Sequence, residues 1–168
     1  LDPDAPAEQL DAFLRRTDAS LVVTSTGSLE GNLLAVPSAM LDGDPTTRFI
    51  GRFDDQVGQA WRIRSNTPFA VDGVELDVVV GPRQSVPTEF LVTVDDVEAG
   101  RFPTGLSASD TERVETIVLP VNAESATTVR IEVAASTDTL TRDWYSNAFI
   151  SMPFAVAEIS NVEIVPGA

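Results

Sequence analysis

The residues with the clearest capacity for chemistry are two aspartates separated by one glycine. Asp42, Gly43 and Asp44 form a turn that is followed by Pro45 and Thr47. Glycine lets the backbone bend sharply and proline stiffens the exit, so carboxylates, a hydroxyl and several carbonyls gather around one corner. Calcium takes six to eight oxygen ligands of these kinds. The turn predicts a calcium site or, as the alternative, an ordinary solvated surface turn.

An EF-hand does not account for this turn. With Asp42 as the first ligand, the sixth position is Thr47 instead of glycine, and the twelfth is Phe53 instead of a bidentate glutamate. The chain also has no His and no Cys. This excludes Ser-His-Asp and Cys-His catalysis, imidazole or thiolate zinc sites, and disulfides. Oxygen ligands remain, and they suit hard cations such as calcium.

The charge balance narrows the set of partners. With 26 acidic and 11 basic residues, the chain has a net charge of −15. Affinity for nucleic acid depends on cationic side chains at phosphates, so we expect no nucleic acid partner. There is no run of about 18 apolar residues, so we expect no membrane insertion by this segment. Every basic residue is Arg, which we interpret as the coding bias of a GC-rich genome or, alternatively, as adaptation to salt.

The first segment differs from the rest of the chain. Leu10, Phe13 and Leu14 recur at helical spacing, with acidic residues before them and Arg15 and Arg16 after them. We predict a linker over residues 1–19 that contains a short amphipathic helix over residues 7–16. The start of the sequence lacks the features of a natural beginning, so we expect a piece of a larger protein.

From residue 20 onward, the pattern is that of short β-strands. Apolar residues alternate with polar ones at Trp61 and Ile63 and over 129–133, and Phe90, Val92 and Val94 alternate with Leu91 and Thr93. Trp61 lies on the inward side of this alternation, so we predict that it is a core residue. The more apolar runs 74–80 and 114–119 predict central strands buried on both faces. Many strands without helices between them predict an all-β sandwich or jelly roll over residues 20–168.

The stretch from Ser38 to Phe49 resembles the coagulation factor 5/8 type C, or discoidin, family and its relatives, the family 32 carbohydrate-binding modules. The 59–63 stretch resembles the second core strand of that family, 128–133 its penultimate strand, and 154–159 its closing strand. The resemblance implies a jelly-roll β-sandwich of the galactose-binding-like kind. Two departures are Phe49 in place of the usual Trp and Arg64-Ser65-Asn66 in place of Asp-Leu-Gly.

The resemblance also implies a structural calcium ion and its ligands. In the family, carbonyl, carboxylate and hydroxyl oxygens from the first loop and the last strand share one ion. The matching positions here are Ala39, Asp42, Asp44, Thr47, Ala157 and Glu158. Without the ion, the repulsion among Asp42, Asp44 and Glu158 is expected to loosen the join between the first and last strands.

The family binds sugars in loops at one end of the sandwich, where aromatic side chains stack on sugar rings and polar groups fix hydroxyls. The loop from Asp138 to Asn147 has that composition. The candidate sugar-binding residues are Arg52, Asp54, Arg142, Trp144, Tyr145 and Asn147. Two alternatives stay open: Trp144 and Tyr145 cover the core, and Arg52, Asp54 and Asp55 are solvated turn charges.

Three functions are compatible with this sequence. The first is a non-catalytic carbohydrate-binding accessory domain of a secreted or membrane-anchored bacterial protein, with a cell-wall arabinan or galactan as the glycan. The second is a spacer or protein-interaction domain of a glycosyltransferase or glycosidase that no longer binds sugar and contacts other domains of its parent. The third is a glycosidase using paired carboxylates, for which no motif singles out a pair. We therefore expect the domain itself not to be an enzyme.

Overall fold

The computed structural model describes residues 21–164 of the 168-residue chain. The predicted helix over residues 7–16 lies outside the described residues and stays a prediction. Within residues 21–164 the structure has nine strands and one 3-10 helix. In chain order these are β1 (Val22–Ser25), η1 (Pro37–Leu41), β2 (Phe49–Ile50), β3 (Ala60–Val80), β4 (Val86–Val94), β5 (Val97–Pro103), β6 (Arg113–Thr137), β7 (Leu140–Arg142), β8 (Phe149–Ser151) and β9 (Ala155–Ile164).

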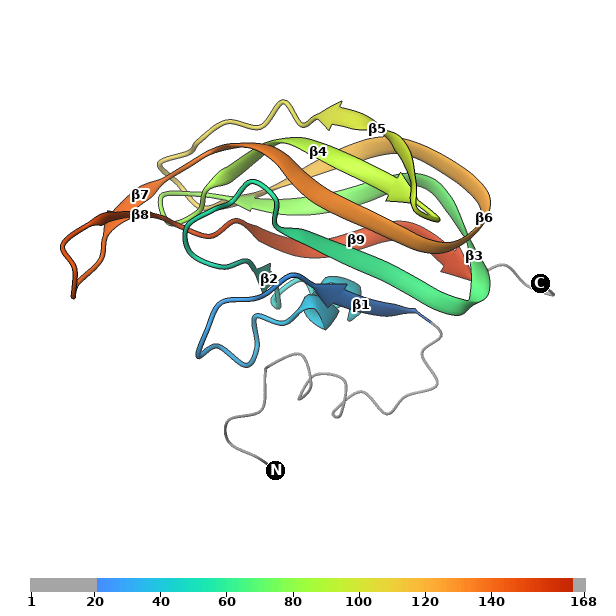
Figure 1. The fold of residues 1–168 in the computed structure, drawn as a ribbon, viewed down its shortest axis with the longest axis horizontal. Coiled ribbons are helices and arrows are strands. Elements are labelled where there is room, and N and C mark those ends of the chain that lie inside the picture. The colour runs from blue at the N-terminus through green and yellow to red at the C-terminus, as the bar shows by residue number, and fades with distance from the viewer. Residues whose placement is uncertain (1–20, 165–168) are drawn as a thin grey trace.

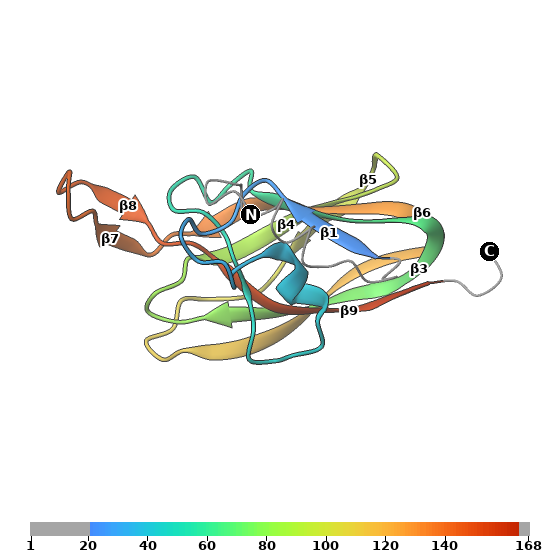
Figure 2. The same ribbon diagram turned by 90° about the horizontal axis from the view of Figure 1, so that it is seen from below.

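Two long, bent strands make the sandwich. β3 has 21 residues and β6 has 25, and they pair antiparallel along most of their length. The register shifts between Arg64 and Val74, and these irregularities let the ladder bend over on itself. One end of the β3–β6 pair continues into β1, β4 and β5, whereas the other continues into β9 and β2. The result is two packed layers (Figures 1 and 2).

The core lies between these layers. It contains residues that the alternating pattern of the sequence predicted to point inward. Ile63 of β3, Val92 of β4 and Ile131 of β6 are fully buried, and Trp61 is 1% exposed. The Trp61 ring lies 5.6 Å from the Phe90 ring and 5.9 Å from the Phe154 ring, measured between centroids. The all-β sandwich expected from the sequence is therefore confirmed, although two of its strands are much longer than the expected short runs.

The predicted burial of the two apolar runs is only partly correct. Val78, Val79 and Val80 are fully buried, as a central strand requires. Val114 and Val118, however, are 51% and 58% exposed, so the prediction that 114–119 is buried on both faces is wrong. The physical reason is that burial alternates along this part of β6: Val114 and Val118 lie on a face that no other layer covers, whereas Leu119 points into the core. This part of β6 is also a sheet edge, because it pairs with β3 on one side only.

Candidate functional site

The Asp42–Asp44 turn closes η1 and is held by its own side chains. Gly43 has a φ of 72°, a left-handed conformation that glycine adopts at little cost. Asp42 Oδ1 accepts a hydrogen bond of 2.8 Å from the Asp44 amide, and Asp42 Oδ2 accepts one of 2.6 Å from Thr47 Oγ1. Thr47 Oγ1 also lies 3.0 Å from the Asp44 carbonyl oxygen. The turn thus brings together the carboxylate, hydroxyl and carbonyl groups that the sequence placed there.

Glu158 of β9 lies beside this turn, although the two are far apart in the sequence. Burial raises the pKa of Glu158 to about 7, helped by a hydrogen bond with the Asp42 carboxyl and by repulsion from Asp42, Asp77 and Asp44. Its Oε1 atom is buried and has no hydrogen-bond partner in the described part of the chain. An orphaned, buried carboxylate oxygen facing other carboxylates is an arrangement that a cation would stabilise.

The carboxylates of the described residues alone do not make a cation site here. The expected set also needs backbone carbonyl oxygens and the Thr47 hydroxyl as ligands. Ala39 of η1 and Ala157 of β9 are both buried, and η1 packs against β9. The Asp44 carboxylate accepts hydrogen bonds from the amide and the hydroxyl of Thr46, and these lower its pKa. In the described residues, no group of three or more acidic side chains is arranged to hold a metal by itself.

Asp77 is a member of this acidic cluster that sequence reasoning missed. It lies directly opposite Glu158 in the β3–β9 ladder, and its Oδ1 accepts a hydrogen bond of 2.7 Å from Thr116 Oγ1. Like charges directly opposite each other in a sheet destabilise it. The sequence did contain a sign of this residue, because acidic residues interrupt the apolar 74–80 run. It could not indicate which strand would pair opposite them.

The candidate sugar loop is a hairpin made by β7 and β8 that projects from one end of the sandwich (Figures 1 and 2). Trp144 and Tyr145 lie in its turn and are 89% and 94% exposed. The alternative that this pair covers the core is therefore wrong. Arg142 stacks over the exposed Phe149 ring, 5.0 Å from its centroid, and donates a hydrogen bond of 3.1 Å to Asn147 Oδ1.

The turn itself is braced by polar contacts. Asp143 accepts hydrogen bonds from the Ser146 amide and hydroxyl, which lower the Asp143 pKa, and Asn147 has a φ of 56°. Asn and Asp tolerate this left-handed conformation better than other non-glycine residues. The aromatic side chains are thus presented on a fixed turn.

Asp54 and Arg52 belong to a loop that runs past the base of this hairpin. Asp54 Oδ1 accepts a hydrogen bond of 3.1 Å from the Ser151 amide, and the Asp54 amide donates one of 2.9 Å to the Ser151 carbonyl. Asp54 is therefore tied to β8, whereas the Arg52 side chain lies against Gly27, in the loop after β1. The structure brings Arg142, Trp144, Tyr145 and Asn147 together, places Asp54 at the base of their hairpin, and turns Arg52 elsewhere.

Two buried glutamines hold the Asp54 loop, and sequence reasoning did not identify them. Gln56 donates to the Arg52 carbonyl and accepts a hydrogen bond of 3.0 Å from the Phe154 amide. Gln59 accepts a hydrogen bond of 2.8 Å from the Arg52 amide and donates to the Asp55 carbonyl. Both side chains are at most 2% exposed. Buried amides with full hydrogen bonding fix a loop that has no regular structure.

No protein-family model and no curated protein matches this sequence. Similar solved structures exist at low identity. The arabinofuranosyltransferase AftD from mycobacteria is 15% identical, with a TM-score of 0.57 over 84% of this chain, which spans only 10% of the transferase chain. The family 32 carbohydrate-binding module of C. perfringens NanJ, solved with galactose, is 14% identical, with a TM-score of 0.54 over 86% of this chain and 94% of the module.

A third similar structure is chitosan-binding module 2 of a Paenibacillus chitosanase/glucanase, solved with chitotriose. It is 11% identical, with a TM-score of 0.54 over 86% of this chain and 96% of the module. Across these modules the match extends over nearly the whole of both chains. In the described residues, no helix is long and apolar enough to span a membrane. This chain has the same β-sandwich fold as the family 32 carbohydrate-binding module of NanJ and the chitosan-binding module.

Proposed function

We propose that this chain is a non-catalytic glycan-binding module, and that the β7–β8 hairpin is its sugar-binding site. The observation that carries the proposal is the almost complete exposure of Trp144 and Tyr145 on a braced turn. Exposing two large aromatic side chains forgoes the hydrophobic stabilisation of burying them. Their faces offer apolar area to sugar C–H bonds, and Arg142 and Asn147 beside them offer hydrogen-bonding groups for hydroxyls.

The chemistry of the similar proteins supports a polysaccharide partner and a place within a larger protein. Two of them are modules solved with galactose and chitotriose, and the third is an arabinofuranosyltransferase. We propose that this module belongs to a secreted or cell-surface protein and that its glycan is a bacterial cell-wall arabinan or galactan. The alternative, a spacer without sugar binding, is favoured by the transferase match, in which such a sandwich is a small part of an enzyme chain.

A glycan array tests the sugar-binding proposal. The purified domain in calcium should bind at least one glycan in a panel of arabinans, galactans, galactosides and chitosan oligosaccharides. In the Trp144→Ala, Tyr145→Ala double variant, that binding should fall at least 10-fold, or about 1.4 kcal/mol, because such residues anchor binding sites. The melting temperature should not change, since both side chains are exposed.

The matched control is Leu33→Ala, Leu34→Ala, which removes two exposed apolar side chains outside the hairpin. It should bind like the original protein. If the hairpin variant binds as well as this control, the sugar site lies elsewhere. If the original protein binds nothing in the panel, the spacer alternative replaces the proposal.

We also propose that a structural calcium ion is held by the Asp42 turn and β9. Asp42, Asp44, Thr47 and Glu158 would supply side-chain oxygens, and Ala39 and Ala157 would supply carbonyl oxygens. The support is that Glu158 Oε1 has no hydrogen-bond partner among the described residues, and that the burial of Glu158 and its repulsion by Asp42, Asp77 and Asp44 raise its pKa. When bound, the ion supplies positive charge that offsets this repulsion. Its role would be to fasten η1 to the closing strand.

In EDTA, Glu158 should make the domain less stable as the pH rises from 5 to 8. Its pKa of about 7 in the folded state lies above the ordinary value of 4.5, so the folded protein keeps a proton that the unfolded chain has released. The stabilisation from this group is complete below about pH 4.5 and is lost as the pH passes 7. Thermal melts of the original protein and Glu158→Gln across this range measure it: the variant should lose less stability than the original protein. Equal slopes would show that Glu158 contributes nothing.

A further inference from the structure

A group of arginines lies on the outer face of the layer formed by β1, the start of β3 and the end of β6. Arg62 and Arg64 flank the buried Ile63, so both point away from the core. Arg130 alternates in the same way on β6 and lies directly opposite Arg62 in the ladder. We call Arg62, Arg64 and Arg130 the arginine stripe.

Few carboxylates neutralise the positive charge of the arginine stripe, although the chain as a whole has a net charge of −15. Among the described residues, no carboxylate lies within ion-pair distance of Arg62 or Arg64, and only Arg130 is paired, with Glu132. Two like charges directly opposite each other in neighbouring strands destabilise the sheet. The chain has 26 acidic residues, yet within its described part Arg62 and Arg64 keep their positive charge unpaired on the surface of a sheet. This charge can attract an anion.

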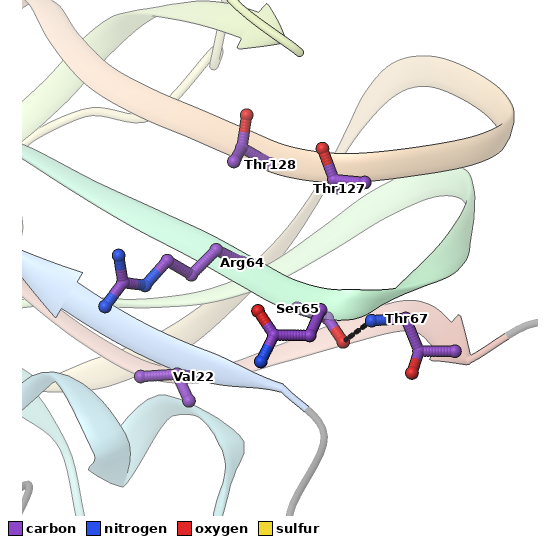
Figure 3. A pocket seen from close by; sticks show the side chains of 7 residues that line it. Val22, Arg64, Ser65, Thr67, Thr127 and Thr128 are labelled. Atoms are coloured by element: carbon purple, nitrogen blue, oxygen red, sulfur yellow. Dashed lines mark hydrogen bonds between the residues drawn. The ribbon is translucent and has the colours of Figure 1, made fainter.

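Two hollows lie along the stripe. The larger, of about 490 Å³, is lined by Val22, Arg64, Ser65, Asn66, Thr127 and Thr128, among others (Figure 3). The smaller, of about 190 Å³, lies one step along the same strands and includes Thr24, Arg62 and Arg130 in its lining. Each hollow therefore combines hydroxyl groups with at least one guanidinium group, and the larger one also contains the amide of Asn66.

The wall of the larger hollow is held in place by Asp95, in the turn between β4 and β5. One oxygen of its carboxylate accepts hydrogen bonds of 2.8 and 2.9 Å from the amides of Thr127 and Thr128, and one of 2.9 Å from Thr127 Oγ1. The two amide hydrogen bonds lower the Asp95 pKa. This acidic group is thus committed to positioning the wall and does not pair with Arg64.

We propose that the arginine stripe binds a carboxylate-bearing glycan, with uronate groups contacting Arg62 and Arg64. The planar guanidinium group matches a carboxylate with two parallel hydrogen bonds, and the Thr, Ser and Asn side chains provide donors and acceptors for sugar hydroxyls. A protein partner fits less well, because Val22 is the one exposed large apolar side chain among the residues lining the hollows, and protein interfaces need apolar anchors. The site is separate from the β7–β8 hairpin, so each proposal holds or fails without the other.

Isothermal titration of the whole chain with oligogalacturonate tests this proposal. The original protein should bind the oligosaccharide and should not bind the same oligosaccharide after its carboxylates are reduced. The Arg62→Gln, Arg64→Gln variant should lose at least 10-fold in affinity. Raising the sodium chloride concentration from 0.05 to 0.5 M should also weaken binding, because exposed charges are screened.

Two control variants make the result specific. Arg83→Gln, Arg113→Gln removes the same amount of charge from exposed arginines elsewhere and should bind normally. Trp144→Ala, Tyr145→Ala should also bind oligogalacturonate normally, which separates this site from the hairpin. The stripe variant should melt at the same or a higher temperature, since it relieves the repulsion between Arg62 and Arg130.

Four outcomes would overturn the proposal. They are the absence of any binding, equal binding of the reduced oligosaccharide, equal loss of affinity in the Arg83→Gln, Arg113→Gln control, and equally tight Arg62- and Arg64-dependent binding of polyglutamate. The last would identify the stripe as a docking surface for an acidic protein segment.

Discussion

Excess EDTA should lower the melting temperature of this domain by roughly 10 °C at neutral pH. An ion present at about 1,000 times its dissociation constant stabilises the folded state by about 4 kcal/mol. For a domain of this size, each kcal/mol corresponds to about 2–4 °C. This expectation rests on Glu158, which has a buried oxygen without a hydrogen-bond partner among the described residues and is repelled by three aspartates. Differential scanning calorimetry with calcium and with EDTA measures the effect.

Two single substitutions show whether that effect comes from the proposed site. Glu158→Gln should melt at nearly the same temperature with and without calcium, because it lacks the carboxylate that draws the ion to β9. Asp77→Asn removes the acidic neighbour directly opposite Glu158, which is not a proposed ligand, and should keep most of the calcium response. An EDTA-insensitive melt of the original protein would refute the calcium proposal.

Trp61→Ala should destabilise the domain by about 3–5 kcal/mol, the cost of removing a large aromatic side chain from a packed core. The Trp61 side chain is 1% exposed and contacts the rings of Phe49, Phe90 and Phe154, with centroids 5.6–6.3 Å away. Few compensating movements are available in such a cluster, because these rings are themselves buried. Urea denaturation measures the free energy of unfolding.

The matched comparison uses the second tryptophan of the chain. Trp144→Ala should change the free energy of unfolding by less than about 0.5 kcal/mol, because this side chain is 89% exposed. Trp61→Phe should cost less than Trp61→Ala, since it keeps most of the ring and removes the buried Trp61 Nε1, which has no hydrogen-bond partner within the described residues. Similar losses for Trp61→Ala and Trp144→Ala would contradict this account of the core.

The sequence determined the features that depend on local pattern. Alternation along 61–63 and 129–133 placed Trp61, Ile63 and Ile131 inward correctly, because side chains in a strand point to opposite faces whatever it pairs with. The spacing of Asp42, Gly43 and Asp44 predicted a tight turn rich in oxygen, and the turn is closed by its own side chains. The calcium ion and the sugar remain proposals, because they depend on groups outside the chain.

Tertiary structure decided everything that depends on register and on position in the sheet. Composition could not distinguish the edge position of Val114 and Val118 from a central one, because a valine-rich run fits either strand. Likewise, the sequence could not tell whether Trp144 and Tyr145 cover the core or stand exposed on a hairpin. Asp77 faces Glu158 because of the register between β3 and β9, and Arg62 faces Arg130 because of the register between β3 and β6. A one-residue shift in either register would separate the corresponding pair. The charges themselves are local, but which charges face one another is set by the fold.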